Sequence, residues 1–366
     1  MSRERPPGSA PVRSLLDMLA APESARSLTL AEWDALVRVA RAARVLGQLR
    51  VRLERAGALA EVPDQVRLHL DSERTLARHR GQMVRWELEC IARALEGFPA
   101  PLVLLKGAAY VAQGFAFAEG RLPSDVDLMV PRAALDAAER ALVAAGWRME
   151  QLDPYDERYY REWSHELPPM RYPEHPLELD LHHTILPLTG RARPDAAALF
   201  ADAMPLADSP FRVLCPADQV LHACAQLFQD SDCAGRLRDL VDIDALIGEL
   251  RAADRFWERL AERAKLHGLE RPLAYALRYA QRFLGTALPD EFLGPPRIPR
   301  LPMDRLVPLA LLPTHPDGAS PLAVRGARLA LFVRSHWLRM PPALLARHAL
   351  TKLWRALRPS EASGGE

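Results

Sequence analysis

The sequence predicts an α/β fold in which a small mixed sheet is flanked by N- and C-terminal helical regions. Two short runs, Leu102 to Leu105 and Asp125 to Val130, are long enough for buried strands. The first run is apolar throughout, and the second alternates acid and apolar residues before it becomes fully apolar. A third run, Leu177 to His182, alternates apolar and polar residues as a half-buried strand does. The chain before and after these runs repeats apolar residues at helical spacing. We therefore expect the strands to form a core that helices cover.

Residues 1–97 are predicted to form an N-terminal helical region. Thr29 followed by Glu32 is typical of a capped helix start, here for a helix over 30–46. A longer helix is expected to begin at Asp64 and to continue to about residue 95. These helices carry arginines on one face and Leu, Val and Ala on the other, which is typical of bundle elements.

Residues 98–190 are predicted to form the core. Helices are expected over 108–117 and 132–145, and 147–152 is a candidate third strand. The polar and aromatic segment 153–176 is expected to be a hairpin or a long loop over the site. Its aromatic side chains suit either stacking on a base or packing within a hairpin.

Residues 191–290 are predicted to return to helix, and 291–366 to form a Pro-rich linker and a basic amphipathic tail. The linker, 288–323, is expected to wrap the surface, and 322–357 to form two helices. Such a tail suits a nucleic acid, an acidic protein or a membrane surface, or is an ordinary packed helix with a basic outside. Its basic and tryptophan residues are Arg325, Arg328, Arg334, Trp337, Arg339, Arg347, Lys352, Trp354, Arg355 and Arg358.

The composition sets broad limits on the class of protein. The 366 residues suit two or three packed units, and 49% hydrophobic residues suffice for a large core. A formal net charge of +1 gives no overall preference for acidic or basic partners. The four cysteines lack CxxC spacing and no signal peptide is recognised, so we expect free thiols in a reducing cytoplasm. The abundance of Ala, Arg, Leu and Pro fits a GC-rich bacterial genome. Arginines interrupt every apolar run, so no membrane span is expected.

Two carboxylates open the second predicted strand. Asp125 and Asp127 are two residues apart, so their side chains project from the same face of the strand. Carboxylates held side by side raise each other's pKa unless a cation lies between them. A hard divalent ion with oxygen ligands, Mg²⁺ above all, relieves this repulsion. The pair therefore indicates phosphoryl or nucleotidyl transfer.

These residues carry a family resemblance. Lys106-Gly107, Arg121 and Asp125-Val126-Asp127 resemble the nucleotidyltransferase superfamily that includes DNA polymerase beta. The resemblance is strongest to a branch of uncharacterised bacterial nucleotidyltransferases. The chain departs from the general superfamily motif in having Lys106-Gly107 where that motif has Gly-Ser or Gly-Gly. The spacing from Gly107 to Asp125 is also longer than the superfamily norm.

A later strand supplies the second signal. Glu178, Asp180 and His182 share one face of the alternating strand. The branch has an acid-Leu-His pattern at this place, which Asp180-Leu181-His182 matches, so the resemblance implies that Asp180 is the third carboxylate. Glu178 is the fallback for this role.

The resemblance implies a Mg²⁺-dependent transferase that moves an NMP from an NTP, such as ATP, to an acceptor hydroxyl and releases pyrophosphate. Two Mg²⁺ ions and the NTP are the implied cofactor and substrate, and the acceptor is left open among a protein, an RNA and a small molecule. The catalytic and metal-binding residues are then Asp125, Asp127 and Asp180. The nucleotide-binding residues are Lys106, Gly107, Arg121, Ser124 and His182.

Several alternatives stay open. His222 and Arg238 are further candidates for phosphate contacts, although Arg238 is also placed to pair with Asp242 at i,i+4. The whole fold can also serve as a catalytically inactive scaffold that binds a protein or nucleic-acid partner. Serine-hydrolase, P-loop and dinucleotide motifs do not occur. The histidines at 165, 175, 182 and 183 do not have the spacing of a zinc site.

Overall fold

The computed structural model describes residues 8–293, 302–314 and 317–347, and it confirms the α/β class. A seven-stranded mixed sheet has the strand order β3-β4-β5-β2-β1-β7-β6. Its strands are β1 (Leu102–Leu105), β2 (Asp125–Met129), β3 (Arg148–Met149), β4 (Met170–Arg171), β5 (Glu178–His182), β6 (Met204–Pro205) and β7 (Phe211–Val213).

The centre of the sheet holds the two acid-bearing strands side by side. Strand β2 pairs antiparallel with β1 and parallel with β5. In this register Asp127 lies beside Asp180, and Asp125 lies beside Glu178. Since laterally paired residues project from the same face of a sheet, the acids of both strands share one face. Val126 and Leu128 are fully buried on the other face.

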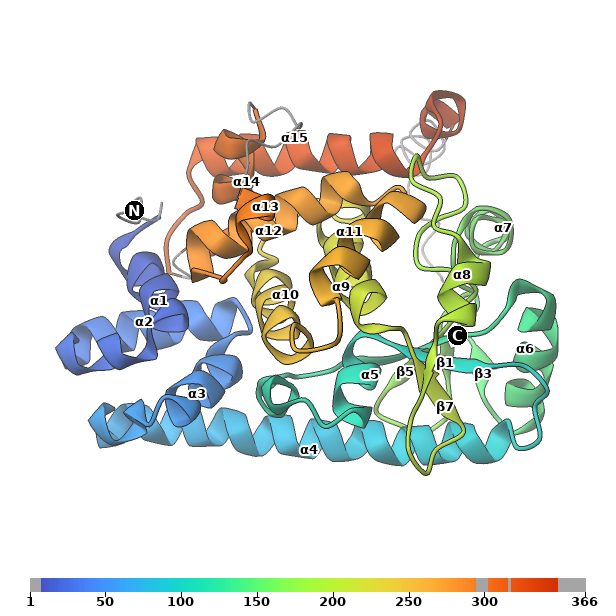
Figure 1. The fold of residues 1–366 in the computed structure, drawn as a ribbon, viewed down its shortest axis with the longest axis horizontal. Helices are drawn as coiled ribbons and strands as arrows, with labels where there is room; N and C mark the ends of the chain where they lie inside the picture. Colours follow the sequence, from blue (N-terminus) through green and yellow to red (C-terminus); the bar gives the residue numbers. More distant parts are fainter. Residues whose placement is uncertain (1–7, 294–301, 315–316, 348–366) are drawn as a thin grey trace, which may run out of the picture.

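Four helices form the N-terminal region: α1 (Ala10–Ala20), α2 (Leu30–Ala42), α3 (Leu46–Arg55) and α4 (Asp64–Ala94). The predicted cap of α2 is confirmed, because Thr29 and Glu32 form a reciprocal capping box. Helix α2 ends before the expected residue 46, since Arg44 has φ 58° in the left-handed region. Helix α4 runs along the length of the molecule beneath the sheet and α5 (Figure 1).

The core contains α5 (Lys106–Ala112), α6 (Leu135–Ala144) and α7 (Pro154–Trp163), with short 3₁₀ turns η3 (Ala116–Gly120) and η4 (Arg132–Ala134). The expectation of a hairpin or long loop after residue 153 is wrong for the part that forms α7. The Asp153 carboxylate accepts hydrogen bonds from the backbone N–H groups of Tyr155 and Asp156. Pro154 occupies the first helical position, where its missing N–H costs nothing.

The C-terminal helices are α8 (Ala196–Ala201), α9 (Pro216–Ala225), α10 (Leu237–Leu250), α11 (Phe256–Leu266), α12 (Glu270–Leu284), α13 (Asp290–Leu293), α14 (Met303–Leu311) and α15 (Leu322–Arg339). A π-helical turn, η5 (Gln226–Asp230), continues α9. The prediction that 191–290 is helical is wrong at β6 and β7, since β7 pairs parallel with β1. The predicted linker is wrong at α14, which accommodates Pro308 within a helix.

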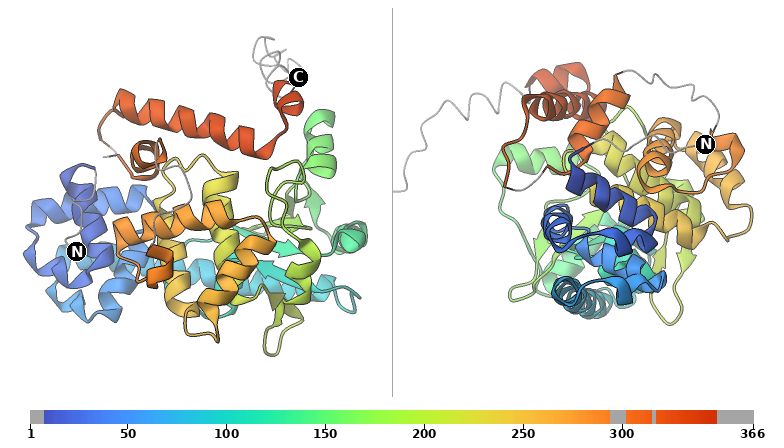
Figure 2. Two further views of the ribbon diagram at one scale, coloured as in Figure 1. Left: turned by 45° about the horizontal axis from the view of Figure 1, so that its top comes forward. Right: turned by 90° about the vertical axis from the view of Figure 1, so that its left-hand side faces the viewer.

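Helix α15 lies across the outside of the C-terminal helices (Figures 1 and 2). One of its basic side chains forms a contact within the chain: Arg334 Nη1 donates a hydrogen bond to the carbonyl oxygen of Phe228 over 2.8 Å. The side chain of Trp337 stacks under the guanidinium of Arg191 at 4.3 Å. The tail residues Lys352, Trp354, Arg355 and Arg358 lie outside the described part of the chain.

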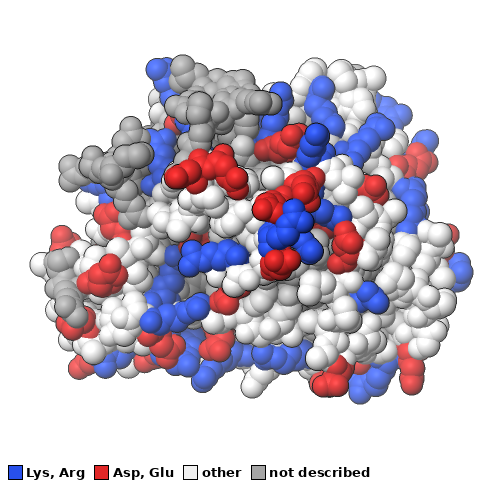
Figure 3. Space-filling view, viewed as in Figure 1, with Lys and Arg blue, Asp and Glu red and all other residues white. Residues whose placement is uncertain are grey.

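The surface charge is mixed. On the face shown in Figure 3, acidic and basic side chains are interspersed over the coloured atoms rather than gathered into one broad patch. This distribution agrees with the net charge of +1. Among the described residues, no helix is both long enough and apolar enough to cross a membrane.

The N-terminal helices meet the core through two glycines. A Cβ on Gly47, in α3, would lie 2.5 Å from the carbonyl oxygen of Gly120, in η3. Both partners at this contact are backbone atoms, so neither can move aside without displacing a helix. The absence of side chains here lets α3 and the loop before β2 approach closely.

We predict that Gly47→Ala lowers the free energy of unfolding by about 2 kcal/mol, because the added methyl group overpacks a backbone contact. The measurement is urea denaturation followed by circular dichroism. Gly248→Ala in α10 is the matched control: a Cβ there would have no atom within 4 Å, and stability should rise by roughly 0.5–1 kcal/mol. Equal effects of the two substitutions would show that the α3 contact is not close-packed.

Candidate active site

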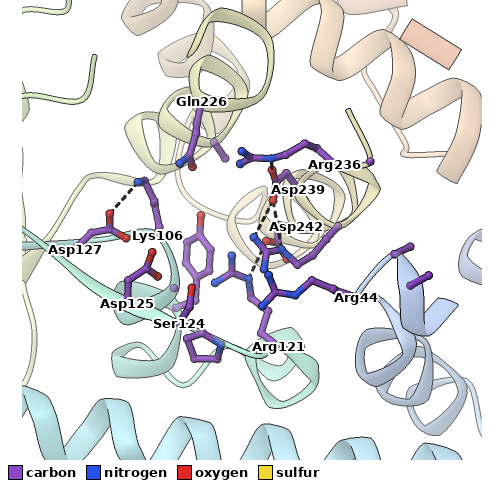
Figure 4. Close-up of a pocket in the computed structure, with 18 residues that line it drawn as sticks. Arg44, Lys106, Arg121, Ser124, Asp125, Asp127, Gln226, Arg236, Asp239 and Asp242 are labelled. Atoms are coloured by element: carbon purple, nitrogen blue, oxygen red, sulfur yellow. Dashed lines mark hydrogen bonds and ion pairs between the residues drawn. The ribbon is translucent and has the colours of Figure 1, made fainter. Parts of the chain in front are cut away.

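A cavity of about 350 Å³ lies where the N-terminal helices, the central strands and α10 meet. Its lining comes from four places along the chain, and Figure 4 shows how these side chains face one another. Asp125, Asp127 and Lys106 gather on one side, and arginines with Asp239 and Asp242 gather on the other. The charged lining residues are Arg44, Lys106, Arg121, Asp125, Asp127, Arg236, Arg238, Asp239 and Asp242.

Asp127 is the most constrained of these side chains. It is only 2% exposed. Its Oδ1 atom contacts Lys106 Nζ at 2.8 Å and His182 Nε2 at 2.9 Å. Burial by itself raises the pKa of Asp127, but the charge of Lys106 and the hydrogen bond from His182 outweigh it and hold that pKa well below its usual range. Asp127 is therefore a permanently ionised carboxylate.

Lys106 reaches Asp127 from the first residue of α5, where its backbone adopts φ 44°. A side chain in this left-handed region costs of order 1 kcal/mol. Burial lowers the pKa of Lys106, but the Asp127 charge outweighs burial and raises that pKa above its usual value. The strained turn thus places a fixed ammonium beside the carboxylate.

Asp125 and Asp180 differ from Asp127 in having no cationic partner. No hydrogen bond or ion pair joins either carboxylate to another described side chain. Burial, and then the nearby charge of Asp127, raises the pKa of Asp125. The same two causes raise the pKa of Asp180 to about 7. Three carboxylates therefore lie together with one ammonium, and two of them are left to repel their neighbour.

Arg121 lies on the side of the cavity that carries the arginines. Its Nε donates to Asp242 Oδ2 over 2.8 Å, and its guanidinium lies 5.2 Å from the centre of the Tyr110 ring. A Cβ on Gly107 would lie 2.6 Å from Arg121 Nη1. Gly107 is therefore the residue that lets the guanidinium pass close to the turn of Lys106-Gly107.

Arg44 is the cation with the least compensation. Among the described residues, Arg44 forms one long hydrogen bond, 3.5 Å, from its Nη2 atom to the carbonyl oxygen of Leu122. Burial and the neighbouring charges of Arg238 and Arg121 lower the pKa of Arg44. Four arginines, Arg44, Arg121, Arg236 and Arg238, thus line one cavity, and this arrangement favours an anionic ligand.

Helix α10 supplies the counter-charges. Asp239 pairs with both Arg236 and Arg238, the latter at 3.3 Å. The considered pairing of Arg238 with Asp242 is not formed, because Asp242 instead binds Arg121 and accepts a hydrogen bond from Gln48. Arg238 keeps one face toward the cavity.

The structure places the predicted site residues in two groups. The cavity is lined by Lys106, Gly107, Arg121, Ser124, Asp125, Asp127 and the candidate Arg238. Asp180 and His182 lie next to it on β5 and do not line it; His182 is fully buried. His222 is also buried, and burial lowers its pKa to about 3. The fallback acid Glu178 pairs with Arg171.

Sequence reasoning missed Arg44 and Tyr110. Tyr110 follows Lys106 by four residues in α5, so helical spacing places the two on one face and would have identified it. Arg44 lies 62 positions before Lys106 in the chain, and no local pattern connects an irregular turn with a distant strand.

A family model described as "Uncharacterised nucleotidyltransferase" matches residues 29–285. The chain belongs to this nucleotidyltransferase family. The matched span begins at the capping residue of α2 and ends just after α12, so it contains every residue of the cavity. Membership supports a general nucleotidyl-transfer activity. Neither a curated protein nor a solved structure matches the chain.

The raised pKa of Asp180 predicts a pH-dependent stability for the chain in the absence of metal ions. Because the folded state binds this proton more tightly than the unfolded state, folding loses stability as pH rises from about 4 to about 7. Asp180→Asn removes this loss. The free energy of unfolding of the variant minus that of the original chain should therefore be roughly 2 kcal/mol larger at pH 8 than at pH 5.

The measurement is urea denaturation in EDTA at both pH values. Glu178→Gln is the matched control on the same strand face, and its effect should not grow with pH. An Asp180→Asn effect that is the same at pH 5 and pH 8 would show that Asp180 does not sit in a desolvated, acidic environment.

Proposed function

We propose that this chain is a Mg²⁺-dependent nucleotidyltransferase that moves an NMP from an NTP to an acceptor hydroxyl. The supporting observation is a set of three neighbouring carboxylates beside a cavity lined by four arginines. Among the described residues, neither Asp125 nor Asp180 has a cationic partner, and Arg44 has no carboxylate partner. A magnesium triphosphate carries the charges that both halves of this site lack.

The donor atoms fit Mg²⁺. Both hydrogen bonds to Asp127 fall on Oδ1, and no hydrogen bond from a described residue uses Oδ2. Asp125 lines the same cavity, and Asp180 lies beside Asp127. Three carboxylate oxygens are the hard ligands that Mg²⁺ prefers. We propose two ions, one on Asp125 and Asp127 and a second shared with Asp180; when bound, they supply positive charge against the triphosphate and acidify the acceptor hydroxyl.

The arginines are proposed to hold the triphosphate. The positive charges of Arg44, Arg121 and Arg238 repel one another in a partly buried cavity. An anion bound between them would offset this repulsion and accept their hydrogen bonds. Lys106, opposite them, adds one positive charge near the acids. A cavity of about 350 Å³ is within the range of small-ligand sites.

The proposed chemistry is an in-line substitution at the α-phosphorus. The acceptor oxygen forms a new P–O bond, the bond from the α-phosphorus to the bridging oxygen breaks, and pyrophosphate leaves with that electron pair. The proton of the acceptor hydroxyl passes to solvent water, because Asp180, as a ligand of the second ion, would have its pKa lowered by the charge of that ion. His182 is a positioning residue in this proposal, because it reaches the reaction only through Asp127.

We predict that Asp125→Asn and Asp127→Asn each reduce Mg²⁺-dependent NTP turnover at least about 100-fold, because each removes a charge that the metal requires. The assay is pyrophosphate release with each of the four NTPs. Glu178→Gln is the control and should keep full turnover, since its carboxylate is held by Arg171. Turnover that is unchanged in both Asp variants would remove the mechanism.

We predict that Arg44→Gln weakens binding of a Mg²⁺ complex of a nonhydrolysable NTP about tenfold, through the loss of one phosphate contact worth about 1.4 kcal/mol. Isothermal titration calorimetry measures the dissociation constant. Arg41→Gln is the matched control, because Arg41 lies three residues earlier and pairs with Glu73 at 3.3 Å outside the cavity. Equal affinities of the two variants would place the triphosphate elsewhere.

One observation favours the rival function, a catalytically inactive scaffold. The Lys106 ammonium already neutralises Asp127, so an internal cation occupies one of the oxygens of the acidic cluster. A thermal-shift screen of the four NTPs with Mg²⁺ separates the two functions, because a ligand that binds the folded state raises its melting temperature. A shift with at least one NTP supports the enzyme, and no shift with any of them supports the scaffold.

A further inference from the structure

A second cluster of ligand-type side chains lies next to Asp127, and its residues do not line the cavity. His165, Glu166 and His182 each offer one atom, and these three atoms lie within 4.8 Å of one another. The isolated bridge between Glu166 and His182 sets their backbones opposite each other, and His183 N–H donates to the carbonyl oxygen of His165 over 2.9 Å. The backbone thus holds all three side chains together.

The tautomer of His182 is fixed by its partner. A carboxylate oxygen accepts hydrogen bonds, so Asp127 Oδ1, 2.9 Å from His182 Nε2, accepts the hydrogen of that nitrogen. A neutral imidazole that donates from Nε2 presents a lone pair at Nδ1. A carboxylate that orients an imidazole through one nitrogen while the other faces a cation is the usual outer shell of a metal-bound histidine.

The Nδ1 atom of His182 has no hydrogen-bond partner among the described residues, although the side chain is fully buried. It faces Glu166 Oε2 at 3.4 Å. The same oxygen lies 3.6 Å from His165 Nε2. Two ligands of a tetrahedral ion are about 3.4 Å apart when each bond is about 2.1 Å long. The separations on both sides of Glu166 therefore match those of atoms that share one ion.

Charges of both signs surround the cluster, since His182 and Lys106 lie near Glu166 as well as the acids. Glu166 is near the charges of Asp127 and Asp230, and Asp180 is near Glu166. The nearby ammonium of Lys106 is already paired with Asp127. The side chain of Glu166 is 25% exposed, so an ion can reach the cluster from solvent.

We propose that His165, Glu166 and His182 bind a transition-metal ion of the Zn²⁺ class. Two imidazole nitrogens with one carboxylate suit Zn²⁺ rather than Mg²⁺, which prefers oxygen ligands. Three protein ligands leave a fourth position for water or another small ligand. The bound ion holds the ring of His182, and through its Nε2 it fixes the carboxylate of Asp127. This site is separate from the proposed magnesium site and does not rest on the proposed activity.

The test uses the full chain, dialysed against a chelator, with Zn²⁺ alone and with Co²⁺ alone as probes. Calorimetry should show one Zn²⁺ per chain, and Co²⁺ should give the visible absorption of a four-coordinate site. Glu166→Gln and His165→Gln should each weaken Zn²⁺ binding at least about 10- to 100-fold. His79→Gln, on an exposed turn of α4, is the control for binding by surface histidines and should bind as the original chain does.

X-ray absorption of the zinc-loaded original chain gives a readout that needs no substitution, and it should show two imidazole ligands. Absence of tight Zn²⁺ binding, or equal affinity in Glu166→Gln and His79→Gln, overturns the inference. Asp125→Asn should keep Zn²⁺ binding while losing affinity for Mg²⁺ with an NTP. A chain that binds the NTP but no Zn²⁺ therefore contradicts this site alone and leaves the nucleotidyltransferase proposal standing.

Discussion

The site depends on one buried charge. Asp127 is nearly inaccessible to water, and an isolated carboxylate in that position costs several kcal/mol. Lys106 from α5 and His182 from β5 offset this cost by converging on one of its oxygens. Their convergence requires the parallel pairing of β2 with β5 and the left-handed turn at Lys106. The sheet register, the strained turn and the ionisation of Asp127 are therefore parts of one arrangement.

The remaining acids follow from that arrangement. Lys106 is paired with Asp127, so burial and, after it, the charge of Asp127 raise the pKa of both Asp125 and Asp180. Across the cavity, Arg121 and Arg238 are paired with carboxylates of α10, whereas Arg44 has no carboxylate partner among the described residues. The unpaired acids and the unpaired Arg44 lie on opposite sides, and a metal–triphosphate complex supplies a counter-charge to both.

The sequence predicted what local spacing controls. Alternation identified β2 and β5, and the shared face of Asp125 and Asp127 follows from the pleat alone. The prediction that Asp127 and Asp180 lie close together depended on a family resemblance, because the sequences of the two strands do not determine the order of strands in the sheet. The contribution of Arg44, the short strand β7 and the meeting of His165 with His182 all depend on long-range packing. Helix α7 was missed although the Asp153-Pro154 start is a recognisable cap.

The most direct test of the three-carboxylate site is anomalous diffraction from crystals grown with Mn²⁺ and a nonhydrolysable NTP. Mn²⁺ occupies magnesium sites and scatters strongly enough to be located without assumptions about the ligand. Our account predicts a peak bound by Asp125 and Asp127, with the triphosphate running toward Arg44 and Arg121. Nucleotide density elsewhere, or an Asp127 carboxylate that binds Lys106 and His182 but no metal, would contradict it.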